Sequence, residues 1–270
     1  MNRLSTAQLL TMSATITLLA GCNVQTTKPD APIAQASLSS PKVLVEHKDP
    51  SPHGSGNVTS DVTEKDKRDQ LQIANKPDDV AVLVNKQNKL PANYTPSDLV
   101  EPNVPFIFKE KEERRLMRKE AAKALEELFN AARKDGIDLA GVSGYRSFDS
   151  QKSLFTYYIS VQGEETARQY SAEPGHSEHQ TGLAMDVSDT KGTCAAEDCF
   201  ADTPHAKWLD KHAPEYGFII RYPKGKEAIT GYNYEPWHIR YVGTDIARTI
   251  QREGITLEEY HQRKTELTKK

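Results

Sequence analysis

Apolar residues recur every three or four positions between residues 109 and 135, which is the spacing of one face of a helix. Leu, Ala and Phe side chains form this face, charged side chains fill the other, and Gly136 follows as a C-cap. This stretch is the clearest helix that the sequence predicts. The same reasoning predicts helices over 150–161, 164–170, 204–212 and 245–253, and a last short helix capped by Thr256.

Alternation of apolar and polar residues predicts two strands. One covers residues 183–187 and has Asp186 on the face opposite its apolar side chains, and the other covers 237–241 and has His238 in the equivalent place. Asp186 and His238 are therefore expected to face one shared pocket. Further strand character is expected over 137–142 and in the β-prone run 80–84. The mixture predicts an α+β fold with a small, mainly antiparallel sheet and flanking helices.

The N-terminus has the pattern of an export signal. Arg3 precedes an apolar stretch over residues 9–19 that is too short and too polar to predict a membrane span. It ends in Leu-Ala-Gly-Cys at Cys22, which resembles the lipobox of bacterial lipoproteins. This resemblance implies that residues 1–22 are a lipoprotein signal peptide, that Cys22 is diacylated, and that the chain is exported and lipid-anchored at the outer face of the bacterial membrane. An ordinary secretory signal with a chance cysteine, or an uncleaved anchor, is the alternative.

Composition divides the remainder of the chain. Residues 23–79 contain scattered Pro, Ser, Thr, Lys and Asp without an apolar period, which predicts a disordered polar linker. Residues 80–270 are long enough for one domain with a hydrophobic core, which we expect to be monomeric. The formal net charge of −3 argues against a nucleic-acid partner, because nucleic-acid binders usually carry a clearly basic face. In an exported chain, Cys194 and Cys199 are expected to form a loop-closing disulfide, with a free pair as the alternative.

Four side chains have the chemistry of a zinc hydrolase. His179, Asp186 and His238 offer two imidazoles and a carboxylate, and three protein ligands leave one position of a tetrahedral zinc open, as in catalytic sites. Glu235 precedes His238 closely enough to lie beside the metal and act as a general base. His176 also has ligand spacing to His179, but we interpret it as a residue at the pocket edge.

Three motifs occur in order: S-G-Y-R-S at 143–147 followed by Gln151, S-x-H-x-x-G-x-A-x-D at 177–186, and E-P-W-H-x-R-Y at 235–241. With them, residues 80–262 resemble the VanY-type D-alanyl-D-alanine carboxypeptidases and the LdcB-type L,D-carboxypeptidases of the M15 group of zinc metallopeptidases. The resemblance implies a zinc site on the sheet. It also implies that His179, Asp186 and His238 bind Zn²⁺ and that Glu235 is the catalytic base.

The same resemblance assigns three more residues. It implies that Arg146 stabilises the developing oxyanion, and that Gln151 and Ser177 hold the substrate near its C-terminal end. A guanidinium is chemically suited to this position, because it pairs with a carboxylate or with transition-state charge. Each residue alone also has a structural interpretation: Arg146 as an ion-pair partner, Ser177 as a turn residue and Gln151 as a helix-surface residue.

The expected function is removal of the C-terminal D-alanine from peptidoglycan stem peptides. D,D-cleavage of a pentapeptide is the preferred interpretation, and L,D-cleavage of a tetrapeptide is the alternative, because the same zinc machinery serves both reactions. An endopeptidase that cuts wall cross-links is a further alternative. A non-catalytic wall-binding lipoprotein with the same fold is the alternative of a different class, but the sequence retains the complete ligand set and Glu235.

Overall fold

A four-stranded antiparallel sheet lies at the centre of the computed structural model, which describes residues 72–74 and 76–268. Its strands are β5 (Leu139–Ser143), β6 (Ala184–Asp189), β7 (Phe218–Tyr222) and β8 (Glu235–Tyr241). They follow the order β5-β6-β8-β7, and every neighbouring pair runs antiparallel. Two pairs of short strands complete the set: β1 (Gln72–Ile73) with β2 (Asn88–Lys89), and β3 (Leu99–Val100) with β4 (Met117–Arg118). The predicted signal peptide, Cys22 and most of the predicted linker lie outside the described residues.

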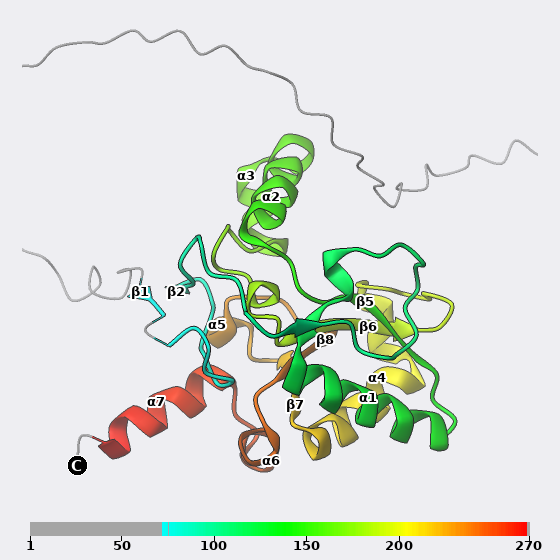
Figure 1. The fold of residues 1–270 in the computed structure, drawn as a ribbon. Helices are drawn as coiled ribbons and strands as arrows, with labels where there is room; N and C mark the ends of the chain where they lie inside the picture. Colours follow the sequence, from blue (N-terminus) through cyan, green and yellow to red (C-terminus); the bar gives the residue numbers. More distant parts are fainter. Residues whose placement is uncertain (1–71, 75, 269–270) are drawn as a thin grey trace, which may run out of the picture. The chain divides into compact units, whose positions relative to one another are not determined.

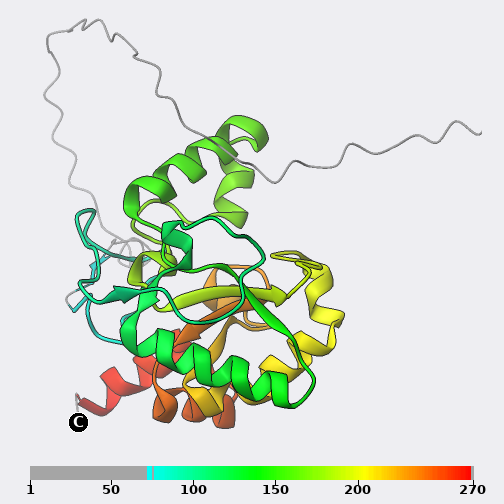
Figure 2. The same ribbon diagram turned by 45° about the vertical axis from the view of Figure 1, so that its right-hand side comes forward.

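Helices flank the sheet, and the predicted α+β class is confirmed. The α-helices are α1 (Lys119–Lys134), α2 (Phe148–Gln162), α3 (Glu164–Tyr170), α4 (Pro204–His212), α5 (Glu227–Thr230), α6 (Thr244–Glu253) and α7 (Leu257–Thr268). Short 3-10 turns are η2 (Glu113–Arg115), η3 (Glu178–Thr181), η4 (Asp198–Asp202) and η5 (Ala213–Tyr216). Both views place α2 and α3 together on one side of the sheet and α1 and α6 on the other (Figures 1 and 2). Among the described residues, no helix has both the length and the apolar character to cross a membrane.

The main core determines which way the strand side chains face. Leu128 of α1, Met185 of β6 and Ile239 of β8 are fully buried in one cluster. Burying a side chain of this size stabilises a fold by roughly 1.5–3 kcal/mol. Because neighbouring residues of a strand point to opposite faces, Asp186 and His238 are turned away from α1. The core therefore places these two polar side chains on the opposite face of the sheet.

The helix predicted over 109–135 begins only at Lys119, so the prediction for the residues before it was wrong. These residues form η2 and β4 instead. Arg118 and Met117 pair with β3, and the backbone N–H of Arg118 donates to the carbonyl of Gly182 at 2.8 Å. Pairing with distant segments thus overrides a helical preference that is only local.

The β-prone run 80–84 also forms no strand. Its backbone serves another purpose, because the carbonyls of Val80 and Val82 accept hydrogen bonds from Nη2 of Arg240 at 3.0 and 2.9 Å. Val82 and Val84 are buried in the main core. The apolar character of this run therefore reflects burial of an irregular segment.

Candidate active site

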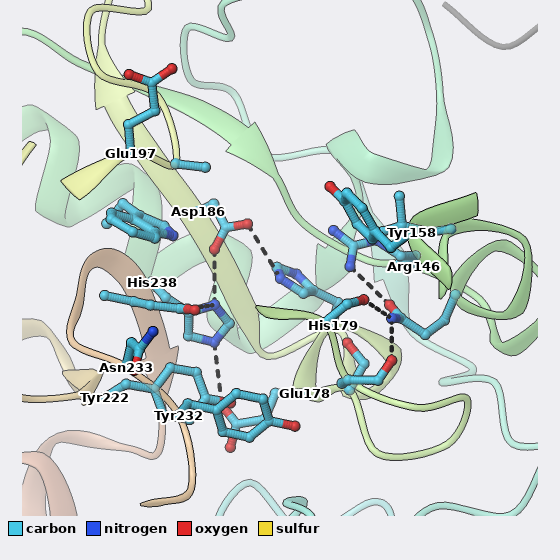
Figure 3. Close-up of a pocket in the computed structure, with 18 of the residues that line it drawn as sticks. Arg146, Tyr158, Glu178, His179, Asp186, Glu197, Tyr222, Tyr232, Asn233 and His238 are labelled. Atoms are coloured by element: carbon cyan, nitrogen blue, oxygen red, sulfur yellow. Dashed lines mark hydrogen bonds and ion pairs between the residues drawn. The ribbon is translucent and has the colours of Figure 1, made fainter. Parts of the chain in front are cut away.

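The sheet register brings the three predicted metal ligands together. Asp186 of β6 lies directly opposite His238 of β8, and η3 carries His179 to the end of the same strands. Oδ1 of Asp186 lies 2.8 Å from Nδ1 of His238, and Oδ2 lies 3.3 Å from Nε2 of His179 (Figure 3). One ligand atom from each residue lies within 4.8 Å of the others. This buried group has the size and donor set of a metal site.

The donor chemistry fits zinc. Two imidazole nitrogens and one carboxylate oxygen are common zinc ligands, and a set of three leaves one position open. Nδ1 of His179 lies 2.8 Å from the carbonyl of Gly144 and donates its proton there, which leaves Nε2, on the side of Asp186, as the nitrogen that can bind a metal. His176 is not part of the group, since its Nδ1 bonds the carbonyl of Asn85 at 2.7 Å.

The pKa values of Asp186 and His238 are shifted by their close partners, against the effect of burial. Burial disfavours the charge of Asp186, but His179 and His238 outweigh this and hold the pKa of Asp186 well below its usual range. Burial also disfavours a charged His238, yet its hydrogen bonds to Asp186 and Glu178 raise the pKa of His238 to about 10. A metal that binds here therefore has to displace a proton, and its affinity must rise with pH.

Glu235 lies beside the ligand group without belonging to it. As the first residue of β8, it places Oε2 4.0 Å from Nδ1 of His238, with its side chain 20% exposed. Burial raises the pKa of Glu235 to about 7, although the nearby His238 opposes the shift. A carboxylate with a pKa close to neutrality is well matched to accept and return a proton.

Arg146 is held in the same cleft by neutral partners. Its Nη1 donates to Oε1 of Gln151 and its Nη2 donates to Oγ of Ser143, both at 2.9 Å. Nε2 of Gln151 in turn donates to the carbonyl of Ala172 at 2.6 Å. Both ends of the Gln151 amide are thus engaged within the chain, which suits Gln151 to orienting Arg146. Ser177 is buried and also lines the cleft.

The cleft around these groups has a volume of about 630 Å³. One helical face of α2 lines it, and so does the loop between Cys194 and Cys199, which form a disulfide as predicted. In the view of Figure 3, Tyr158 of α2 and Glu197 of this loop lie on different sides of the ligand group. The site is therefore open enough to admit an extended peptide end.

Sequence reasoning missed the buried charges behind the ligands. Oε1 of Glu178 accepts hydrogen bonds from Nε of Arg221 at 2.7 Å and from Nη1 of Arg240 at 2.6 Å. Burial disfavours the charge of Glu178, but the two arginines outweigh it and keep the pKa of Glu178 well below its usual range. Glu178 and Arg240 lie inside quoted motifs, which was a usable signal. Nothing near Arg221 in the sequence indicated its partner.

Comparison with known proteins assigns the family. The protein-family model described as VanY: D-alanyl-D-alanine carboxypeptidase matches residues 114–244. YodJ of Bacillus subtilis (strain 168), named as a carboxypeptidase, is 52% identical over 197 residues, which is 73% of this chain and 72% of the relative. The chain belongs to the VanY family. The resemblance inferred from the three motifs is therefore confirmed for the family.

Two solved carboxypeptidase structures have a fold similar to that of this chain. The LdcB LD-carboxypeptidase is 53% identical, with a TM-score of 0.69, over 71% of this chain and 90% of that one. The vancomycin-resistance D,D-pentapeptidase VanY, in complex with Zn(II), is 34% identical, with a TM-score of 0.55, over 67% of this chain and 98% of that one. Carboxypeptidases of both specificities thus share this fold, and one of them is seen with zinc.

Proposed function

We propose that this chain is a zinc-dependent carboxypeptidase that removes the C-terminal D-alanine from peptidoglycan stem peptides. The observation that carries the proposal is the buried group of His179, Asp186 and His238, with Glu235 beside it. Membership of the VanY family supports the reaction class, and the Zn(II) complex of a VanY protein supports the metal.

The side chains divide the chemistry of amide hydrolysis among them. A zinc ion held by His179, Asp186 and His238 would polarise the scissile carbonyl and make water more acidic. Glu235 accepts the proton of the attacking water and gives it to the departing amine nitrogen when the C–N bond breaks. Arg146 supplies a fixed positive charge for the negative charge that develops on the carbonyl oxygen.

The penultimate residue of the stem distinguishes two forms of this reaction. The greater likeness to LdcB, at 53% identity against 34% for the VanY structure, supports L,D-cleavage of tetrapeptides. The description of the family model supports D,D-cleavage of pentapeptides, which is also the interpretation preferred from the sequence. We propose terminal D-alanine release as the common activity, with tetrapeptide stems as the better substrate and pentapeptide stems as the second candidate.

Mass spectrometry of the products tests both the release of D-alanine and the preferred stem peptide. The purified full chain, loaded with zinc, is incubated with tetrapeptide and pentapeptide stems and with cross-linked dimers. D-alanine release from the tetrapeptide alone would establish L,D-cleavage, and release from the pentapeptide alone would establish D,D-cleavage. A chelator should abolish the release and added zinc should restore it. Cutting of cross-links alone would identify an endopeptidase, and no cleavage by the zinc-bound chain would contradict an enzymatic role.

A further inference from the structure

A carboxylate lies directly behind His238, on the side away from Asp186. Oε2 of Glu178 lies 3.5 Å from Nε2 of His238, while Nδ1 of the same ring faces Asp186 (Figure 3). The side chain of Glu178 has no exposure to solvent, and that of His238 has only 5%. His238 thus has one ring nitrogen turned toward the ligand group and the other turned toward a buried anion.

Two arginines hold this carboxylate in one orientation. Arg221 of β7 and Arg240 of β8 both donate to Oε1 of Glu178, and both side chains are fully buried. Their hydrogen bonds occupy Oε1 and leave Oε2 directed at His238. A carboxylate that is buried and charge-paired in this way is costly to displace, because each arginine would lose a charged hydrogen-bond partner in the protein interior.

The arginines are themselves fixed by distant parts of the chain. Nη1 and Nη2 of Arg221 donate to the carboxylate of Glu258 in α7 at 3.0 and 2.6 Å. Nη2 of Arg240 donates to the carbonyls of Val80 and Val82. Every side chain of this network therefore has charged or polar partners within the described part of the chain, and the network joins five segments: the run 80–84, η3, β7, β8 and α7.

The chemistry of imidazole gives this arrangement a consequence. A neutral ring carries its proton on one nitrogen and a lone pair on the other, and an acceptor at one nitrogen favours the tautomer that leaves the other free. A carboxylate behind a metal-ligating histidine selects the tautomer and fixes the ring plane. For His179 the corresponding acceptor is the carbonyl of Gly144, and it meets Nδ1 instead.

We propose that Glu178 is a positioning residue for the metal site. It accepts the Nε2 proton of His238, clamped by Arg221 and Arg240, so that His238 binds the metal through Nδ1 whereas His179 binds it through Nε2. This inference rests on the proposed zinc site. It gives a function to Glu178 and to Arg240, which lie inside two of the three sequence motifs but take no part in the proposed reaction.

The ligating nitrogens can be observed directly in the wild-type chain. The full chain is labelled with ¹⁵N at histidine and loaded with ¹¹³Cd, and the scalar coupling between the metal and the ring nitrogens is recorded. We expect coupling to one Nδ1 and one Nε2. Coupling to Nε2 in both ligands would overturn the inference while leaving the metal site intact. Failure of the wild-type chain to bind cadmium or zinc would overturn the proposed metal site, and the inference with it.

Variants test whether Glu178 controls metal binding. Glu178→Asp keeps the charge between the arginines but withdraws the carboxylate from His238, and Glu178→Gln removes the charge. We expect zinc affinity, measured by competition with a chromophoric chelator, to fall about 10- to 100-fold. The visible spectrum of the cobalt-loaded variants should also change, because the ring of His238 is no longer fixed.

Glu258→Gln is the matched control. It removes a carboxylate that pairs with the same Arg221 but does not contact His238. We expect it to lower thermal stability, but zinc affinity and the cobalt spectrum should change less than in the Glu178 variants, because Nε of Arg221 and Nη1 of Arg240 still hold Glu178. An equal loss of zinc affinity in Glu258→Gln and Glu178→Asp, or wild-type affinity in folded Glu178 variants, would overturn the inference. If both Glu178 variants fail to fold, the cadmium couplings of the wild-type chain decide the question.

Discussion

Glu235 is the residue on which the proposed chemistry depends most, and its position separates catalysis from metal binding. Its carboxylate is 4.0 Å from Nδ1 of His238 and outside the ligand group. Glu235→Gln should therefore retain zinc but lose the proton acceptor, and kcat should fall about 10²- to 10⁴-fold, the usual contribution of general base catalysis. The measurement is the rate of D-alanine release alongside the zinc content of the same sample.

The control for this variant is Glu227→Gln, which changes an exposed glutamate of α5 that does not line the cleft. It should turn over at the wild-type rate. If Glu235→Gln also keeps wild-type activity, Glu235 is not the base. If it loses zinc together with activity, the carboxylate serves the metal site instead.

The raised pKa of Glu235 predicts an acid limit on activity. Burial raises this pKa from 4.5 to about 7, so the carboxyl keeps its proton to higher pH than an exposed glutamate. Since only the ionised form accepts a proton, kcat/KM should rise with pH on the acid side and fall about tenfold for each pH unit below the pKa. The positive charge of bound zinc favours the ionised form, so the acid limb of the zinc-loaded chain should lie below pH 7.

The experiment is a pH profile of kcat/KM with zinc occupancy measured at every point, because acid also protonates the histidine ligands. A decline that tracks zinc loss alone would attribute the limb to the ligands. A flat profile with zinc bound throughout would contradict the assignment of Glu235.

At the scale of elements, the sequence predicted the helices and strands whose residue pattern is complete within one continuous segment. The helix over 164–170 is found with those bounds, and the alternation around Asp186 and His238 placed both side chains on one face of the sheet. Met117 and Arg118 were assigned wrongly, because β3 pairs with them from an earlier part of the chain. Patterns within a short window cannot contain that information.

Distance along the sequence also separates the predictable part of the site from the rest. The grouping of His179, Asp186 and His238 was predictable, because each residue type implies its chemistry and the motifs give the spacing. The charges behind His238 were not visible, because Glu178 meets Arg221 across 43 positions of sequence and Arg221 meets Glu258 across a further 37. Only the packing of η3, β7 and α7 around β8 brings them together.

The disulfide loop is an element whose contribution can be measured. The bridge between Cys194 and Cys199 closes a loop with a sequence separation of 5, and Glu197 and Asp198 of this loop line the cleft. Cys194→Ser with Cys199→Ser should lower the free energy of unfolding by on the order of 2 kcal/mol, as expected for a short cross-linked loop. The KM for stem peptides should rise, because the freed loop no longer holds one wall of the cleft.

Urea unfolding of the wild-type chain, with and without a reductant, provides the comparison. The reduced wild type should unfold at the same urea concentration as the double variant. Equal midpoints for the oxidised and reduced wild type would show that the bridge does not stabilise the fold, and an unchanged KM would show that the cleft wall does not need it.

At the scale of the whole molecule, we propose that Cys22 anchors the chain to the outer face of the membrane through two acyl chains. Two chains give stable anchoring, whereas one is marginal. The full chain, expressed in a bacterial host that processes lipoproteins, should sediment with membranes and incorporate labelled fatty acid. Cys22→Ala should lose the label and move to the soluble fraction. A wild-type chain that is soluble and unlabelled would indicate an ordinary secretory signal. A Cys22→Ala chain that still sediments with membranes would indicate that residues 1–22 remain attached as an uncleaved anchor.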